Sequence, residues 1–164
     1  MFVALAITLD SPGPIFYRQE RVGKAGRIFQ IAKLRTMIPD AERLSGPTWA
    51  QEDDPRITRV GRVLRRWSID ELPQLFNVLC GQMSLVGPRP PLPEEVEEYT
   101  EKHMKRLQTI PGITGVWQIS GRSSLGFEEM VKLDLYYVDN WSVWMDFAIL
   151  LITPLAIVSR KGAY

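Results

Sequence analysis

One stretch in the middle of this 164-residue chain constrains its fold most. Apolar residues recur at helical spacing over residues 57–67 and arginines occupy another face, so an amphipathic helix is predicted. The run SIDELPQL follows at residues 68–75, and its proline has no N–H to donate. Pro73 therefore belongs in the first turn of a helix, where N–H groups are unpaired anyway. We expect this second helix over residues 70–79, with Asp70 near its N-cap.

The remaining pattern predicts a single α+β domain, mostly helical with one small β-hairpin, which a chain of this length allows. Two short runs rich in β-forming residues, 15–19 and 28–33, lie on either side of a glycine-containing turn and predict the hairpin. In chain order, the other segments are predicted to be a short helix at 39–44, a loop at 46–55, a helix at 93–107, irregular chain at 111–122, a helix at 127–138 and an apolar run at 143–158 that Asp146 and Pro154 interrupt.

Composition excludes several kinds of site. Cys80 is the single cysteine, so the chain has no internal disulfide and no cysteine-based zinc site. His103 is the single histidine, which argues against a histidine-rich metal site and a Ser-His triad. We expect Cys80 to be a small core residue and His103 to be solvated. The net charge is only +1, but five arginines crowd residues 56–66, and this local excess predicts an anionic partner.

The adjacent acids Asp70 and Glu71 have two interpretations. In the first they cap a helix, because Ser68 and Glu71 form an S-x-x-E capping box and acids in a first turn interact favourably with the helix dipole. In the second they take part in phosphate chemistry, because carboxylates can attack phosphorus or hold a metal while guanidinium groups bind phosphate oxygens. Without context capping is favoured, and the neighbouring arginines favour the second interpretation.

The arginine-rich stretch and a later turn are also open to more than one interpretation. Residues 56–66 fit a solvated helix face, a nucleic-acid patch or a basic amphipathic helix at a membrane surface. No recognised nucleic-acid motif accompanies them, so nucleic acid is not an expected partner. The sequence GPRP at residues 87–90 is typical of a rigid turn, on which Arg89 would be pre-organised to bind an anion.

Together these segments resemble the bacterial sugar transferase family, the monotopic phosphoglycosyl transferases that begin the assembly of polysaccharides, such as exopolysaccharide and O-antigen, on a polyprenyl phosphate. The resemblance covers nearly the whole chain from Asp10 onward. Its motifs, in the family's order, are DSPGPIFYRQERVG at 10–23, KLRTM at 33–37, the arginine-rich stretch at 56–66, SIDELPQL at 68–75, SLVGPRP at 84–90, PGITGVWQISGR at 111–122 and KGAY at 161–164.

The resemblance implies that Asp70 and Glu71 form a catalytic dyad. Asp70 would attack the sugar-bearing phosphate of a UDP-sugar and form a covalent phosphosugar intermediate, with release of UMP and transfer to polyprenyl phosphate. Mg²⁺, held at Asp70 and Glu71, would offset charge repulsion. Gln82 stands where the family usually has an acid, and we interpret it as structural. The residues expected to bind phosphate or substrate are Lys33, Arg35, Arg65, Arg89, Gln118 and Arg122.

The resemblance also implies association with lipids at the cytoplasmic face of the bacterial inner membrane. Residues 1–9 match the last turns of a longer apolar segment that enters the membrane as a re-entrant helix in the family, and residues 10–164 match the catalytic domain. We therefore expect either a shortened form or a natural start inside that element. The tryptophans Trp141 and Trp144 and the apolar run at 147–158 are expected to be partly core and partly membrane contact. The alternative function is a catalytically silent membrane-surface or partner-binding module with the same fold.

Overall fold

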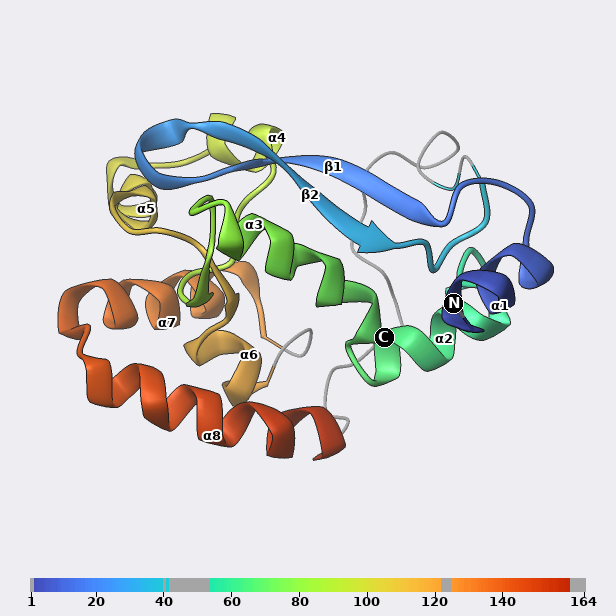
Figure 1. Ribbon diagram of the computed structural model, residues 1–164. Helices are drawn as coiled ribbons and strands as arrows, with labels where there is room; N and C mark the ends of the chain where they lie inside the picture. Colours follow the sequence, from blue (N-terminus) through green and yellow to red (C-terminus); the bar gives the residue numbers. More distant parts are fainter. Residues whose placement is uncertain (1, 40, 42–53, 122–124, 160–164) are drawn as a thin grey trace.

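The computed structural model describes residues 2–39, 41, 54–121 and 125–159 (Figure 1). Helices dominate it, and the predicted α+β class with a small hairpin is confirmed. None of the helices in these ranges is long and apolar enough to cross a membrane. The elements in chain order are α1 (Phe2–Asp10), β1 (Phe16–Val22), η1 (Lys24–Gly26), β2 (Ile28–Leu34), α2 (Arg59–Arg66), η2 (Ile69–Gln74), α3 (Leu75–Leu79), β3 (Ser84–Val86), α4 (Pro93–Glu97), α5 (Glu101–Met104), η3 (Lys105–Gln108), β4 (Gly112–Thr114), α6 (Val116–Ser120), α7 (Phe127–Asn140) and α8 (Val143–Ser159), where η denotes a 3₁₀ helix.

The predicted hairpin is present as the antiparallel strands β1 and β2, paired in register from Phe16 opposite Leu34 to Val22 opposite Ile28. Directly paired residues present their side chains on the same face of a sheet. The inner face buries Phe29 and Ile31, which pack with residues from the second half of the chain. In Figure 1 the hairpin runs across the top of the molecule, and η2 packs against β2 from below.

Helix α2 is confirmed, and two separate side chains satisfy its first N–H groups. Thr58 caps it by accepting a hydrogen bond from the N–H of Gly61 at 2.9 Å. Asp10, at the end of α1, accepts one from the N–H of Val60 at 2.8 Å. A Cβ atom on Gly61 would lie 2.0 Å from the carbonyl oxygen of Thr36, so glycine allows the helix to approach the exit of β2 closely. Asp10 in the first motif therefore holds α1 to α2.

The segment 111–122 was predicted to be irregular, and that prediction is wrong for the part the structure describes. It contains β4, which pairs in parallel with β3, and the short helix α6. A Cβ atom on Gly112 would lie 2.1 Å from the backbone nitrogen of Gly87, so the two strands can approach only because this glycine has no side chain. The glycines of this segment serve close backbone packing rather than turns alone.

The single helix predicted over 93–107 is also wrong, because three short helices (α4, α5 and η3) replace it. Thr100 interrupts the helix and caps α5 by accepting a hydrogen bond from the N–H of His103 at 3.4 Å. His103 is buried, contrary to expectation, against the rings of Tyr99 and Phe127, which also contact each other. Its Nε2 lies 3.4 Å from Glu128 Oε1, so the imidazole connects α5 to α7.

The last two helices form a corner. Helix α7 agrees with the prediction, and α8 continues through both Asp146 and Pro154. Asp146 accepts hydrogen bonds from Tyr137 Oη at 2.8 Å and Trp141 Nε1 at 3.1 Å, which fixes the corner. Ile149 is buried in α8, but most of the other large apolar side chains of this helix are exposed.

Two further expectations concern single segments. Cys80 is exposed at the end of α3, so its placement in the core is wrong. The predicted helix at 39–44 and loop at 46–55 lie almost entirely outside the described residues. At the end of that gap, Asp54 pairs with Arg56 at 2.6 Å, and this hydrogen-bonded partner lowers the pKa of the Asp54 carboxyl to about 2.

Candidate active site

The two adjacent acids lie in η2, and the predicted capping arrangement is absent. Ser68 precedes η2 with φ at 53°, an uncommon conformation for a residue other than glycine, and its side chain makes no cap hydrogen bond. Asp70 is the second residue of η2 rather than its N-cap. The capping-box interpretation is therefore wrong, and neither acid is committed to the helix terminus in that way.

Asp70 is buried on the inner side of η2, with a relative exposure of 7%. Among the described residues, no other side chain donates a hydrogen bond to its carboxylate. Burial, and then the neighbouring charge of Glu71, raise the pKa of Asp70 to about 6, while Lys33 and Arg65 act in the opposite direction. The carboxylate is thus largely ionised at neutral pH, and the backbone N–H of Asp70 itself favours the charged form. Because no described side chain donates to it, the carboxylate is available as a nucleophile.

Glu71, the second acid, forms an ion pair with a residue of β2. Its Oε1 lies 2.7 Å from Nζ of Lys33, which is on β2. Both side chains are partly exposed at this contact. The strand therefore brings the predicted cation Lys33 directly to the acid pair.

Arg65 reaches the same place from the last turn of α2. Its Nε donates a hydrogen bond to Thr36 Oγ1 at 2.8 Å. Burial lowers the pKa of Arg65, and Asp70 is the foremost group that opposes this shift. The structure therefore gathers Asp70, Glu71, Lys33 and Arg65 from η2, β2 and α2 into one cluster.

Arg89 projects from the turn between β3 and α4. Its Nη1 lies 3.2 Å from Glu95 Oε2, and the same carboxylate oxygen accepts a hydrogen bond from the N–H of Leu92 at 2.9 Å. Arg21, a buried arginine on β1, lies beside this turn and donates to the carbonyl oxygen of Pro90 at 3.0 Å. We did not single out Arg21 from the sequence, and the only signal for it was its place in the motif at 10–23.

The other predicted substrate residues are placed differently. The Arg35 guanidinium donates to the carbonyl oxygens of Ser11 at 2.6 Å and Pro12 at 2.9 Å, so it holds the turn before β1. Gln118 Nε2 donates to the carbonyl of Ile113 at 3.4 Å, and its Oε1 is buried without a described partner. Arg122 lies outside the described residues.

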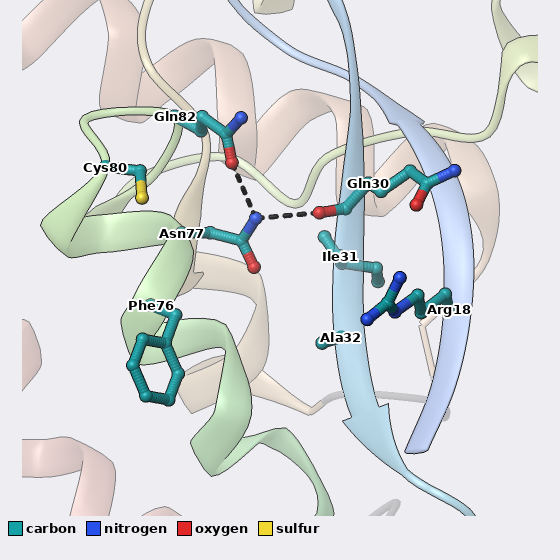
Figure 2. A pocket seen from close by; sticks show the side chains of 8 residues that line it. All are labelled: Arg18, Gln30, Ile31, Ala32, Phe76, Asn77, Cys80 and Gln82. Atoms are coloured by element: carbon teal, nitrogen blue, oxygen red, sulfur yellow. Dashed lines mark hydrogen bonds between the residues drawn. The ribbon is translucent and has the colours of Figure 1, made fainter. Parts of the chain in front are cut away.

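Gln82 makes contacts that fit its structural interpretation. Asn77 donates through Nδ2 to Gln82 Oε1 and to the carbonyl oxygen of Gln30, each at 2.8 Å (Figure 2). These bonds fasten the end of α3 to β2 beside a hollow of about 220 Å³, whose walls include Phe76. Figure 2 shows this hollow between the strand and the helix.

Magnesium would have to be bound by few protein ligands. In the described ranges, no group of three or more His, Cys, Asp or Glu residues could hold a metal ion. Mg²⁺ is usually bound by one or two protein carboxylates, with water and substrate phosphates completing the octahedron. The adjacent carboxylates of Asp70 and Glu71 fit that pattern.

Comparison with known proteins gives the class of the molecule. Residues 1–160 match the family described as bacterial sugar transferase. The chain belongs to this family, as its motifs predicted.

Three relatives illustrate what the chain is similar to. It is 48% identical to the galactosyl transferase CpsE of Streptococcus agalactiae, with 92% of this chain and 36% of that protein covered. It is 42% identical to the undecaprenyl-phosphate galactose phosphotransferase of Salmonella typhimurium (96% and 36% covered). It is 48% identical to the undecaprenyl-phosphate glucose phosphotransferase of Komagataeibacter xylinus (99% and 32% covered). The chain thus spans about a third of the length of these relatives.

Proposed function

We propose that this chain transfers a sugar-1-phosphate from a UDP-sugar to a polyprenyl phosphate and releases UMP. The observation that carries the proposal is the buried carboxylate of Asp70, which lies beside Glu71, Lys33 and Arg65 and accepts no hydrogen bond from another described side chain. The names of two relatives support the acceptor, since they are undecaprenyl-phosphate phosphotransferases of galactose and of glucose. The reaction would be the first membrane step in the synthesis of a polysaccharide.

The proposed reaction has two displacement steps at one phosphorus atom. An Asp70 carboxylate oxygen first attacks the phosphorus that bears the sugar, and the bond from that phosphorus to the oxygen of UMP breaks, so UMP leaves with the electron pair. An oxygen of the polyprenyl phosphate then attacks the same phosphorus, and the bond to Asp70 breaks. The carboxylate is restored, and the acceptor becomes a polyprenyl diphosphate sugar.

The neighbouring residues would stabilise the negative charge of the phosphate groups during these steps. Arg65 and Arg89 would bind phosphate oxygens through their planar guanidinium groups, and Lys33 would both pair with Glu71 and contribute positive charge. Mg²⁺ held by Asp70 and Glu71 together with substrate oxygens would offset the repulsion between a carboxylate and a diphosphate. Arg35, Gln118 and Arg122 stay in the proposal as more distant substrate contacts.

We also propose that the chain works against lipid, at the cytoplasmic face of the inner membrane. The segment formed by η2 and α3 supports this, because its polarity is inverted: its buried residues are Asp70, Gln74 and Asn77. Its outer face carries four apolar side chains that are 42–82% exposed, and α8 exposes a further apolar row. Exposed apolar surface of this kind is typical of membrane or protein contacts. The four side chains on the outer face are Leu72, Leu75, Phe76 and Leu79.

A UMP-release assay tests the proposed function. The chain is incubated with several UDP-sugars, Mg²⁺ and undecaprenyl phosphate in detergent, and UMP is quantified. Exchange of labelled UMP into UDP-sugar without acceptor isolates the first step, because only an enzyme that forms a covalent intermediate catalyses it. A catalytically silent membrane or partner-binding module would release no UMP with any donor, and that result would refute the proposal.

A further inference from the structure

The backbone of the four-residue turn that carries Arg89, residues 88–91, is held through its carbonyl groups. Pro88, Pro90 and Pro91 have no N–H, so the backbone of this segment takes part in hydrogen bonds mainly through its carbonyl oxygens, as an acceptor. Each of its four carbonyl oxygens accepts from a different donor. The donors are Gly112 N to Pro88 O at 2.9 Å, Arg106 Nη2 to Arg89 O at 3.4 Å, Arg21 Nη1 to Pro90 O at 3.0 Å and Val22 N to Pro91 O at 2.9 Å.

Two of these donors are buried arginines, and among the described residues only one of them forms an ion pair. Arg106 forms an ion pair with Asp134, with Nη2 2.6 Å from Oδ2, and both side chains are almost completely buried. Arg21 is only 7% exposed, and its other partner is the neutral Gln19 Oε1 at 2.6 Å. Its Nε is buried without a hydrogen bond. Among the described residues, no carboxylate lies within ion-pair distance of Arg21.

An unneutralised buried charge is costly to folding, and a neutral donor could hold the carbonyl of Pro90 equally well. Burial lowers the pKa of Arg21 to about 9, and the nearby positive charge of Arg89 is the next cause. Arg21 therefore remains charged at neutral pH although its surroundings disfavour the charge. A role in folding alone does not explain why an arginine occupies this position.

The orientation of Arg21 relates it to the candidate active site. Tyr17 pairs with Lys33 across the hairpin, and Arg21 lies four residues after Tyr17 on β1. Since side chains alternate along a strand, Arg21 and Lys33 share the face against which η2 packs. Glu95, which pairs with Arg89, and then Glu71 are among the more distant charges that raise the pKa of Arg21 against the effect of burial.

We propose that Arg21 is a positioning residue whose charge is neutralised by the bound diphosphate rather than by the protein. It holds the turn of Arg89 through the carbonyl of Pro90, and it adds a second fixed positive charge behind the Arg89 guanidinium. The ligand class is a nucleoside diphosphate or another diphosphate. The identity of this diphosphate as the UDP-sugar rests on the proposed function.

Binding of UDP and of inorganic pyrophosphate to the full chain tests this inference without any need for turnover. Arg21→Met removes the charge, and we expect it to weaken UDP binding about tenfold, as for one fixed charge acting in a partly buried site. Its unfolding midpoint without ligand should equal or exceed that of the parent chain. Arg21→Lys keeps the charge and should bind UDP within about threefold of the parent. Arg18→Met, which removes an exposed arginine on the same strand, is the matched control and should change neither quantity.

The outcomes separate charge from structure. Unchanged UDP binding in Arg21→Met overturns the inference, and so does a lower unfolding midpoint or a failure to fold, since the charge would then serve the fold. If UDP binding weakens in Arg21→Met but no UDP-sugar is turned over by the parent chain, the inference stands and the proposed function fails. If the parent chain turns over a UDP-sugar and Arg21→Met binds UDP as tightly as the parent, the proposed function stands and the inference fails.

Discussion

The η2–α3 segment and helix α7 each bury one aspartate, but they do so in opposite settings. In α7, Asp134 lies among the buried apolar residues Met130, Val131 and Leu135, and the outer face is largely polar. In η2–α3, Asp70 shares the buried face with polar residues, and the outer face is apolar. Burial raises the pKa of both carboxyl groups. The difference lies in what the carboxylates contact.

Asp134 is bound by Arg106 through two hydrogen bonds, from Nε at 2.9 Å and from Nη2 at 2.6 Å. The Arg106 guanidinium also bonds to Tyr99 and to the carbonyl of Arg89, so this ion pair supports the turn at Arg89 from behind. Asp70 has the cations Lys33 and Arg65 nearby, but no other described side chain donates a hydrogen bond to its carboxylate. A buried aspartate therefore forms a structural ion pair in α7, whereas the one in η2 has no described ion pair.

The largest expected effect separates the two aspartates by activity. Asp70→Asn should abolish UMP release and the UMP exchange reaction, because the amide keeps the shape of the side chain but is a poor nucleophile. Asp134→Asn should leave the chemistry of each folded molecule intact. The measurement is UMP release per folded chain, with folding checked by circular dichroism. Full activity in Asp70→Asn, or a phosphosugar adduct trapped on another residue, would remove Asp70 from the mechanism.

Stability should respond in the opposite order. Asp134→Asn leaves the buried Arg106 without its counter-ion and should lower the free energy of unfolding by about 3–5 kcal/mol. Asp70→Asn should cost little, since Asp70 has no described ion pair to lose. Replacing both partners, as Arg106→Met with Asp134→Leu, should recover much of the loss. Denaturant unfolding of the four chains measures this, and equal destabilisation by both Asn variants would invalidate the comparison.

The sequence predicted the features that depend on residues close together in the chain, and it missed those that depend on residues far apart in the chain. Local periodicity was enough for α2, α7 and the hairpin, and adjacent acids beside arginines predicted a site at Asp70 and Glu71. The capping box failed because the left-handed Ser68 redirects the chain. The burial of His103 depends on Phe127, and β4 depends on β3, both distant in sequence. Such partners leave no periodic signal, and Arg21 was missed for the same reason.

Loss of Arg65 or Arg89 should lower activity less than loss of Asp70, but more than a change of one pH unit does. Arg65→Ala and Arg89→Ala should each raise the transition-state free energy by roughly 2–4 kcal/mol, the usual loss for one charged donor at a site of developing charge. Lysine at either position should restore only part of the rate, because an ammonium cannot form the planar fork. The ratio kcat/KM for the UDP-sugar is the measurement, with Arg18→Ala as the exposed control. Full rescue by lysine would mean that only net charge is required.

Activity and stability should depend on pH with opposite signs at Asp70. Its pKa is about 6 in the folded chain against 3.8 for the unperturbed group, so the folded state holds this proton more tightly. The contribution of Asp70 to stability is therefore fully present below pH 4 and is lost as the pH rises to 6. The nucleophile is ionised only above about pH 6, so kcat/KM should fall about tenfold per unit below that pH.

Comparison with Asp70→Asn isolates this dependence. The variant should gain stability relative to the parent between pH 4 and 6 and gain no more above pH 6. Unfolding curves at a series of pH values give the difference. A constant difference across this window would show that Asp70 titrates normally.

The smallest expected effect concerns the outer faces of the two helices. Phe76→Ser with Leu79→Ser on α3 should weaken binding to anionic liposomes by about tenfold, because the two exposed apolar side chains together contribute roughly 1.4 kcal/mol when they are partly buried in lipid. Stability should change by less than about 0.5 kcal/mol, since both side chains are mostly exposed in the fold. Tyr136→Ser on α7, an exposed aromatic on the polar helix, is the control and should bind as the parent does.

High salt should release much of the parent chain, because it screens the attraction between the arginines of α2 and the lipid. Unchanged liposome binding combined with a shift in oligomeric state would instead assign the apolar face of α3 to a protein contact.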